Sequence, residues 1–179
     1  MTRDSWTILP ATPEFLSDIL KIEEACFSAP WTRKMLEAEL SGNPFAHFLL
    51  AKVGEAEGSP SSIVGYLCYW IVFEEVRLMN LAVIESMRHR GIARSLVRAA
   101  LQTGLSQSAH RAVLEVRASN RAAQTLYRGF GFRQTAIRPQ YYHQPVEDAV
   151  LMELDPIVMD TGPGSAVCLD EGGHSKPLQ

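Results

Sequence analysis

The 179-residue sequence contains few cysteines and no long apolar segment. Cys26, Cys68 and Cys168 are widely spaced and none forms a Cys-x-x-Cys pair, which excludes a disulfide framework and favours a reducing compartment. The longest apolar run covers residues 66–73, whereas a membrane helix needs about 20 residues. Residues 1–10 do not lead into a signal-peptide pattern. These absences predict a cytoplasmic protein that makes no membrane contact.

Several catalytic motifs are also missing. The sequence has no Gly-x-Ser-x-Gly elbow and no His-Glu-x-x-His pair, which argues against the common hydrolases. It has neither a Gly-x-Gly-x-x-Gly nor a Walker motif, so dinucleotide and nucleotide-triphosphate sites are disfavoured. Cys168 and His174 offer two ligands where a structural zinc site needs four. We therefore expect no metal.

Charge is unevenly distributed along the chain. The net charge is −3, which argues against a surface that binds nucleic acid directly. From Arg77 to Arg138, however, there are eleven arginines, no lysine and only two acids, Glu85 and Glu115, giving +9 against −12 for the remainder. Guanidinium groups suit phosphate oxygens, so this stretch predicts a local anion site. Arginines scattered over solvated helix faces are the alternative.

Hydrophobic periodicity predicts a single α/β domain with a mixed sheet. Three- and four-residue spacing indicates helices at 13–25, 32–40, about fifteen residues from Gly91, and 121–128. Branched and aromatic runs indicate strands at 45–53, 63–73, 76–83, 112–117, 132–137 and 149–154. The first three strands follow one another without a helix, which is typical of an antiparallel meander. Residues 156–179 are rich in Gly, Pro and Ser and are expected to form a disordered tail.

A basic loop between a strand and a helix is the first candidate for chemistry. The segment 81–93 reads Leu-Ala-Val-Ile-Glu-Ser-Met-Arg-His-Arg-Gly-Ile-Ala. The first amides of a helix lack intrahelical partners and sit at the positive end of its dipole. Small residues at Gly91 and Ala93 allow a ligand to approach the backbone. This arrangement suits a pyrophosphate, with arginines adding charge around it.

Two further segments make the pattern more specific. They are Leu-Glu-Val-Arg-Ala-Ser-Asn at 114–120 and Leu-Tyr-Arg-Gly-Phe-Gly-Phe at 126–132. Together with the basic loop, they resemble the GNAT acetyltransferase family and, within it, the ribosomal-protein alanine N-acetyltransferases of the RimI type. The resemblance spans about residues 6–154. Glu85 stands where many relatives have a proline, and Ala93 replaces the second glycine of the loop.

The resemblance implies a GNAT fold over residues 1–155, with a mostly antiparallel mixed sheet of six to seven strands and about four helices. It implies acetyl-CoA as the cosubstrate and transfer of acetyl to a protein N-terminal amine, that of the alanine of the eighteenth small-subunit ribosomal protein. The residues that match cofactor contacts in the family are Leu81, Ala82, Val83, Arg88, His89, Arg90, Gly91, Ile92, Ala93, Arg94 and Asn120.

Two residues match catalytic positions of the family. Glu115 matches the general base, and it is an acid inside an apolar strand, where burial without a partner costs several kcal/mol. An ion pair with Arg117 or another arginine is the alternative. Tyr127 matches the residue beside the cofactor sulfur, and a tyrosine can donate a proton to a thiolate. A purely packing tyrosine is its alternative.

Two loops are expected to enclose the incoming peptide. Phe27 and Trp31 follow the first helix, and Tyr141 and Tyr142 lie in the expected loop 138–149. Paired tyrosines offer amphipathic surface and hydroxyl groups at little entropic cost. A role in capping the core is the alternative for Trp31 and one tyrosine. The predicted partner is thus a protein N-terminus, with the enzyme acting as a monomer.

Other functions remain open from the sequence. A GNAT enzyme could instead acetylate a lysine or a small amine. A noncatalytic CoA-binding module associated with the ribosome is a third reading, against which the joint presence of Glu115, Asn120 and Tyr127 argues.

Overall fold

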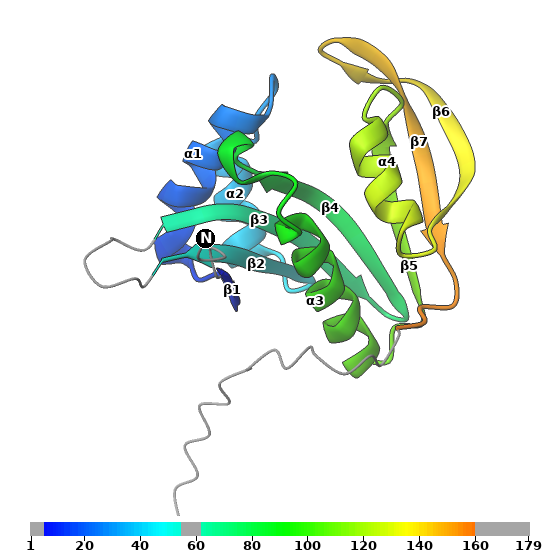
Figure 1. The fold of residues 1–179 in the computed structure, drawn as a ribbon, viewed down its shortest axis with the longest axis horizontal. Coiled ribbons are helices and arrows are strands. Elements are labelled where there is room, and N and C mark those ends of the chain that lie inside the picture. Colours follow the sequence, from blue (N-terminus) through cyan, green and yellow to red (C-terminus); the bar gives the residue numbers. More distant parts are fainter. Residues whose placement is uncertain (1–5, 55–61, 160–179) are drawn as a thin grey trace, which may run out of the picture.

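The computed structural model describes residues 6–54 and 62–159 and contains one seven-stranded sheet (Figure 1). The strand order is β1-β2-β3-β4-β5-β7-β6, and every neighbouring pair is antiparallel except β4 and β5. The strands are β1 Trp6–Pro10, β2 Ala46–Val53, β3 Ser62–Val72, β4 Glu75–Val83, β5 Arg111–Arg117, β6 Arg133–His143 and β7 Val146–Leu154. This confirms the predicted mixed, mostly antiparallel sheet and its initial meander.

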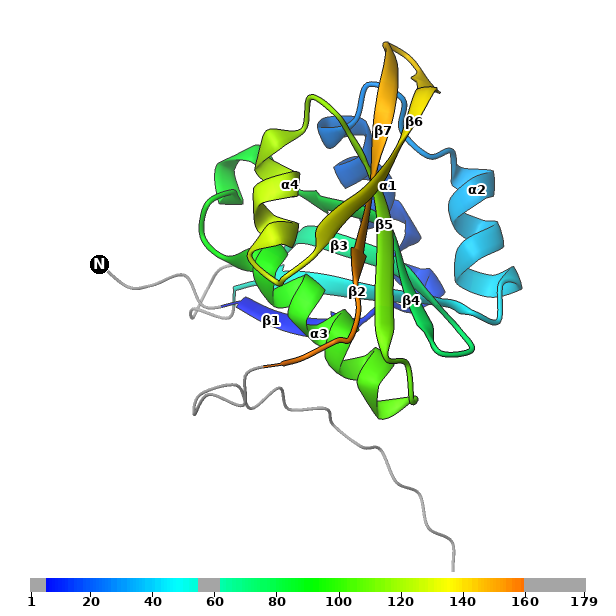
Figure 2. The same ribbon diagram turned by 90° about the vertical axis from the view of Figure 1, so that its right-hand side faces the viewer.

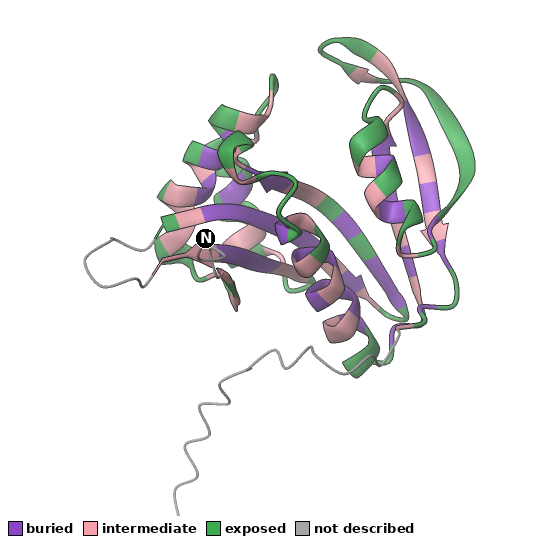
Figure 3. Ribbon diagram, in the orientation of Figure 1, coloured by how far each residue is buried: buried purple, intermediate pink, exposed green. Residues whose placement is uncertain are grey.

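Four α-helices cover the two faces of the sheet (Figures 1 and 2). They are α1 Leu16–Cys26, α2 Arg33–Glu37, α3 Ile92–Ser106 and α4 Arg121–Arg128. Short turns flank them: η1 Pro13–Phe15, η2 Ala38–Gly42 and η3 Glu85–Met87. One buried cluster unites α3 and α4 with the sheet, and a second lies under α1 and α2. Figure 3 shows this burial running along the middle strands.

Helix α3 forms where the apolar stripe was predicted. Its buried face includes Ile92, Leu96, Ala100 and Gly104. At Gly104 the helix approaches β4 so closely that an added Cβ would lie 2.2 Å from Cγ2 of Val76. Glycine is therefore required here by packing, although it lowers helix propensity.

Strands β4 and β5 pair over only part of their length. Their parallel register runs from Glu75 opposite Arg111 to Leu78 opposite Leu114 and then stops. Beyond this point β4 continues beside β3, and β5 continues beside β7. The two strands therefore separate in the middle of the sheet, and Figure 1 shows them diverging.

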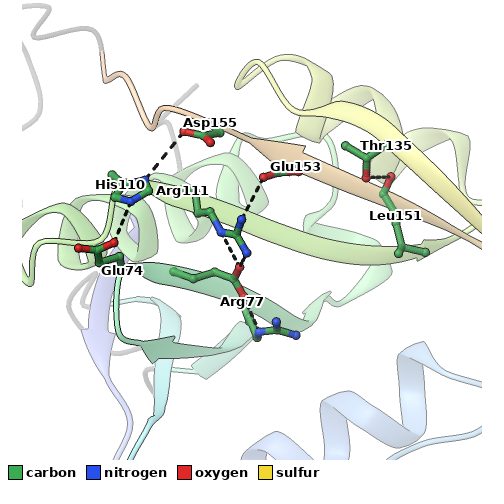
Figure 4. A network of polar contacts seen from close by, with 9 residues as sticks. Glu74, Arg77, His110, Arg111, Thr135, Leu151, Glu153 and Asp155 are labelled. Carbon is green, nitrogen blue, oxygen red and sulfur yellow. Dashed lines mark hydrogen bonds and ion pairs between the residues drawn. The ribbon is translucent and has the colours of Figure 1, made fainter.

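A polar network holds the paired end of these strands together (Figure 4). The largely buried carboxylate of Glu75 bonds Arg77 at 2.5 Å and also bonds Arg111. Arg111 reaches Glu153 on β7 at 3.6 Å. These bonds join β4, β5 and β7 at the paired end.

The structure corrects three sequence predictions. Strand β1 was not predicted: its five residues become a strand by pairing with the edge of β2. Strands β6 and β7 are longer than predicted and take up most of the expected loop 138–149, because β6 is an edge strand that tolerates Pro139 and a bulge. The predicted tail boundary at residue 156 is too early. Ile157 is buried, and its amide donates to the His110 carbonyl at 2.6 Å. Residues 160–179, including Cys168 and His174, lie outside the described chain.

In the two described ranges, no helix combines the length and the apolar composition needed to cross a bilayer.

The close approach at Gly104 can be tested by stability measurements. Replacing Gly104 with alanine should lower the free energy of unfolding by about 1–3 kcal/mol, because the new methyl group overlaps Val76. Gly42→Ala is the matched control, since no atom lies within 4 Å of its added Cβ. Urea denaturation of both variants checks the difference. Equal stability of the two variants would contradict this packing.

Candidate active site

Two adjoining cavities occupy the cleft between β4 and β5. The smaller has a volume of about 460 Å³ and the larger about 880 Å³. Both are lined by Cys26, Phe27, Leu81, Asn120 and Ala123, so they meet between the end of β4 and the start of α4. A ligand in one cavity can therefore reach a ligand in the other.

The smaller cavity contains the predicted cofactor residues, with one exception. Its lining includes Leu81, Ala82, Val83, Arg88, His89, Gly91, Ile92, Ala93, Arg94 and Asn120. Arg90 is not among the lining residues, and its guanidinium donates to the carbonyl of Ser86 at 3.4 Å. The cavity also includes Cys26, Met87, Ala122 and Leu126, which carried no recognisable sequence signal.

Backbone conformation shapes the loop before α3. Gly91 has φ +92° and His89 has φ +61°, both in the left-handed region. Since an added Cβ at Gly91 would meet only the Trp6 ring at 3.8 Å, the positive φ and not crowding explains the glycine. Arg88 donates from Nε to the Val83 carbonyl at 3.0 Å and so ties the loop back to β4. The loop places the start of α3 at the cavity.

The start of α3 supplies anion-binding groups. The first hydrogen bond at this end of the helix runs from the Ser95 amide to the Gly91 carbonyl. The amides of Ile92, Ala93 and Arg94 precede that bond and have no intrahelical partner, and these three residues line the cavity. With the helix dipole and the Arg88 side chain, they form a surface that suits a pyrophosphate.

The arginines of residues 77–138 do not all gather at the predicted anion site. Arg94 lies over the Phe130 ring, 4.9 Å from its centroid, and so joins α3 to the end of α4. Arg111 and Arg138 bond acids on the other side of the cleft. Of the eleven arginines in this stretch, five form ion pairs or ring contacts: Arg77, Arg94, Arg111, Arg117 and Arg138. Arg88 and Arg94 line the smaller cavity, together with the start of α3.

The larger cavity contains every predicted catalytic and substrate residue: Phe27, Trp31, Glu115, Tyr127, Tyr141 and Tyr142. Glu115 lies on β5 just beyond the last residue paired with β4. Its Oε1 accepts from Nη1 of Arg138 at 2.7 Å, and its side chain is 31% exposed. The ion pair left open by the sequence therefore exists, but its partner is Arg138; Arg117 instead bonds Glu147 at 3.2 Å.

Tyr127 on α4 is buried and packs against Phe132, with ring centroids 5.7 Å apart. Burial raises the pKa of its hydroxyl, and proximity to Tyr142 adds to the increase. No described residue hydrogen-bonds this hydroxyl, although every fully buried side-chain polar atom in the described chain has a partner. The hydroxyl therefore opens onto the cavity as a protonated donor.

Arg117 contacts the β6–β7 hairpin that carries Tyr141 and Tyr142. The Arg117 guanidinium lies 4.1 Å from the Tyr142 ring centroid and donates to the carbonyls of Gln144 and Pro145. Glu147 accepts from the Ser119 amide at 2.5 Å. Burial and nearby Glu115 raise the pKa of Tyr142 to about 12. Arg117 therefore sets the position of the hairpin.

Glu115 also influences Tyr141. It is the chief cause that raises the pKa of the Tyr141 hydroxyl. The ring of Tyr141 in turn lies 4.9 Å from the Arg138 guanidinium. Glu115, Arg138 and Tyr141 therefore form one connected group on the cavity wall.

A buried acid that sequence reasoning missed fixes the opposite wall. Glu23 of α1 has no exposed surface and accepts from the Trp31 amide at 2.6 Å, from Asn80 at 2.8 Å and from the Tyr66 hydroxyl. Burial raises the pKa of its carboxyl, and these donors oppose the increase. The only sequence signal for Glu23 was the position of an acid next to Ile22, on the apolar face of the first helix. Glu23 links the Trp31 loop to β3 and β4.

The two walls meet above the larger cavity. Ser28, between α1 and α2, donates to the carbonyl of Gln144 in the β6–β7 turn at 3.5 Å. This exposed contact connects the loop after α1 with the tip of the hairpin.

The chain is similar to known proteins over most of its length. The profile of the "Acetyltransferase (GNAT) family" matches residues 16–132. A Bacillus subtilis (strain 168) protein, provisionally named a ribosomal protein bS18-alanine N-acetyltransferase, is 35% identical over 139 residues, covering 78% of this chain and 88% of that protein. The Escherichia coli (strain K12) enzyme named ribosomal protein bS18-alanine N-acetyltransferase is 31% identical over 140 residues, covering 77% and 88% of the two chains.

A solved structure supports the same relationship. The crystal structure of the ribosomal-protein-S18-alanine N-acetyltransferase from Escherichia coli superimposes with a TM-score of 0.75 at 27% identity. The match covers 90% of this chain and 99% of that one. With its split seven-stranded sheet, its amide-lined loop and these matches, the chain belongs to the acetyltransferase (GNAT) family.

Proposed function

We propose that this protein transfers the acetyl group of acetyl-CoA to the N-terminal α-amine of a protein, namely the alanine of ribosomal protein bS18. The observation that carries the proposal is the meeting of two cavities in one cleft, one at the start of α3 and the other between the loop after α1 and the β6–β7 hairpin. The names of the relatives supply the substrate. Ribosomal proteins are made in the cytoplasm, so the enzyme acts there. Both cavities belong to one chain, which is consistent with a monomer.

The smaller cavity fits the cosubstrate. The amides at Ile92 and Ala93 suit its pyrophosphate, and the edge of β4 at Leu81 and Ala82 has no strand partner in the cleft. A pantetheine amide can therefore pair with this edge, which leads the thioester toward Tyr127. Acetyl-CoA supplies an acyl carbon activated by its thiolate leaving group.

The role proposed for Glu115 is to accept the proton of the amine. An α-amine has a pKa of about 8 and a lysine amine about 10.4, so a neutral α-amine is about 3 kcal/mol easier to obtain. A carboxylate acting directly or through water suffices for that task. The amine nitrogen then bonds the acetyl carbon, and its proton leaves toward Glu115.

The role proposed for Tyr127 is to protonate the departing sulfur as the carbon–sulfur bond breaks. Its raised pKa keeps the hydroxyl protonated at neutral pH, and the hydroxyl faces the cavity where the thioester would end. A tyrosine hydroxyl beside the sulfur can supply the proton that the departing thiolate, with a pKa of about 8.5, takes up.

A direct test uses a peptide that begins with alanine and carries an internal lysine. Incubation with acetyl-CoA should add one acetyl group, and fragment masses should place it on the α-amine, because that amine is the more easily deprotonated. Addition to lysine alone would favour a lysine acetyltransferase. Binding of CoA without any transfer would favour a noncatalytic module.

Replacing Glu115 with glutamine should lower kcat by about 100-fold or more, because a general base is lost. The affinity for CoA should not change, since Glu115 does not line the smaller cavity. Glu37→Gln is the control, because Glu37 also pairs with an arginine, Arg33, but lies on α2 outside both cavities. Steady-state kinetics with calorimetry of CoA binding provides the measurement. Unchanged turnover would remove Glu115 from the mechanism.

Gly91→Ala should weaken CoA binding about tenfold, since a left-handed φ costs a non-glycine residue about 1–2 kcal/mol. The loop can relieve that strain only by moving its amides. Isothermal titration calorimetry with CoA measures the change. Gly42→Ala, far from the cavity, should bind CoA like the unmodified protein, and equal affinity of both variants would refute the role of the loop.

A further inference from the structure

The ion pair between Glu115 and Arg138 joins one residue inside the larger cavity to one outside it. Nη1 of Arg138 donates to Oε1 of Glu115 at 2.7 Å, and the two side chains are 50% and 31% exposed. Glu115 lines the larger cavity, whereas Arg138 lines neither the larger nor the smaller one. Both residues line a third, neighbouring cavity of about 610 Å³. Arg138 therefore lies behind Glu115 as seen from the two adjoining cavities.

We propose that Arg138 is a positioning residue for acetyl transfer, which holds the carboxylate of Glu115 where it can receive the proton of the substrate amine. This inference rests on the proposed function, because it assumes that Glu115 is the base. Arg138 contacts neither the amine nor the thioester and acts through Glu115.

The register of three strands brings the two residues together. Strand β7 lies between β5 and β6. Its Leu151 is opposite Glu115, and its Ala149 is opposite Arg138. Residues two apart in a strand point to the same face of the sheet, as do directly opposite residues of neighbouring strands. Ala149 is fully buried and has only a methyl group, so the long side chain of Arg138 can cross β7 toward Glu115.

A bulge in β6 supplies a second contact to Arg138. Just after this residue the register with β7 shifts, and within the shifted stretch Gln140 has φ +50°. The Gln140 amide donates to Oδ1 of Asp148 on β7 at 2.9 Å, which holds the bulge in place. The ring of Tyr141 then lies 4.9 Å from the Arg138 guanidinium. The guanidinium thus contacts an aromatic ring and the Glu115 carboxylate at once, which restricts its movement.

The other arginines near Glu115 are engaged elsewhere. Arg117, two residues along β5, bonds Glu147 at 3.2 Å and lies against the Tyr142 ring. Arg77 and Arg111 line the third cavity, but both bond Glu75. Loss of the Arg138 side chain would therefore leave the Glu115 carboxylate free to move.

A general base gains from such a contact. A free glutamate side chain samples several rotamers, whereas a base must lie within hydrogen-bond reach of the proton that it accepts. A carboxylate has acceptor positions on both oxygens, so the bond from Arg138 to Oε1 leaves others for the amine. Because the pair is partly exposed, it adds little to the stability of the fold. Its main effect is thus on where the carboxylate lies.

Steady-state kinetics on a peptide that begins with alanine tests this role. Arg138→Met should lower kcat about tenfold through the loss of orientation, while the KM for the peptide and the affinity for CoA change by less than about twofold. Arg138→Lys keeps a donor but loses the planar guanidinium, so its kcat should lie between the two. Arg133→Met is the matched control and should keep the unmodified kcat, because Arg133 is exposed on the same strand and lines none of the three cavities.

A double substitution separates positioning from an independent contribution. Adding Arg138→Met to Glu115→Gln should cause no further loss of kcat, since Arg138 then has no base to position. A role that does not pass through Glu115 would lower kcat by the same factor in both backgrounds.

An unchanged or increased kcat of Arg138→Met would overturn the inference. A raised KM with unchanged kcat would also overturn it, because Arg138 would then bind the peptide directly, and so would equal losses in the two backgrounds. If circular dichroism shows that Arg138→Met does not fold, Arg138→Lys makes the same comparisons. Acetylation of the α-amine by the unmodified enzyme tests the proposed function separately, since it does not depend on what Arg138 does.

Discussion

The architecture depends on a hydrogen-bonded ladder that stops halfway. Strands β4 and β5 pair in parallel up to Leu78 and Leu114 and then part, although each keeps its other neighbour. Backbone groups along the cleft are left to pair with ligands, because buried amides and carbonyls require partners. Glu75 and its two arginines secure the closed end, so the strands can diverge without the sheet separating. The position of the cleft thus follows from where pairing ends.

Buried polar groups place the loops on either side of this cleft. Glu23 receives three hydrogen bonds and fixes the loop that contains Trp31. Arg117 binds two hairpin carbonyls and lies against Tyr142, and Glu147 anchors the start of α4 through Ser119. Glu23 is fully buried, and its three hydrogen bonds specify one arrangement of the groups around it, because a buried polar group without partners is costly. The loop after α1 and the β6–β7 hairpin are thus each held by several polar contacts.

Sequence reasoning succeeded where a local pattern decides the outcome. The apolar stripe of α3 appears as expected, because its periodicity is a local property of the sequence. It failed where pairing partners are distant: β1 exists because β2 offers an edge, and the hairpin of β6 and β7 extends through Pro139 because that strand has a free edge. The acid in the apolar strand, Glu115, was identified, but nothing local indicated that Arg138 would be its partner.

The sequence by itself determined the order of elements, the glycine at the left-handed loop position and the residue types brought to the cleft, because these depend on periodicity, backbone conformation and short spacings. Tertiary structure decided which arginines face acids and which face the cavity, and it brought Glu23, Asn80 and Trp31 together from separate elements. Such outcomes depend on contacts between residues far apart in the chain, whose distances are set only when the sheet is assembled.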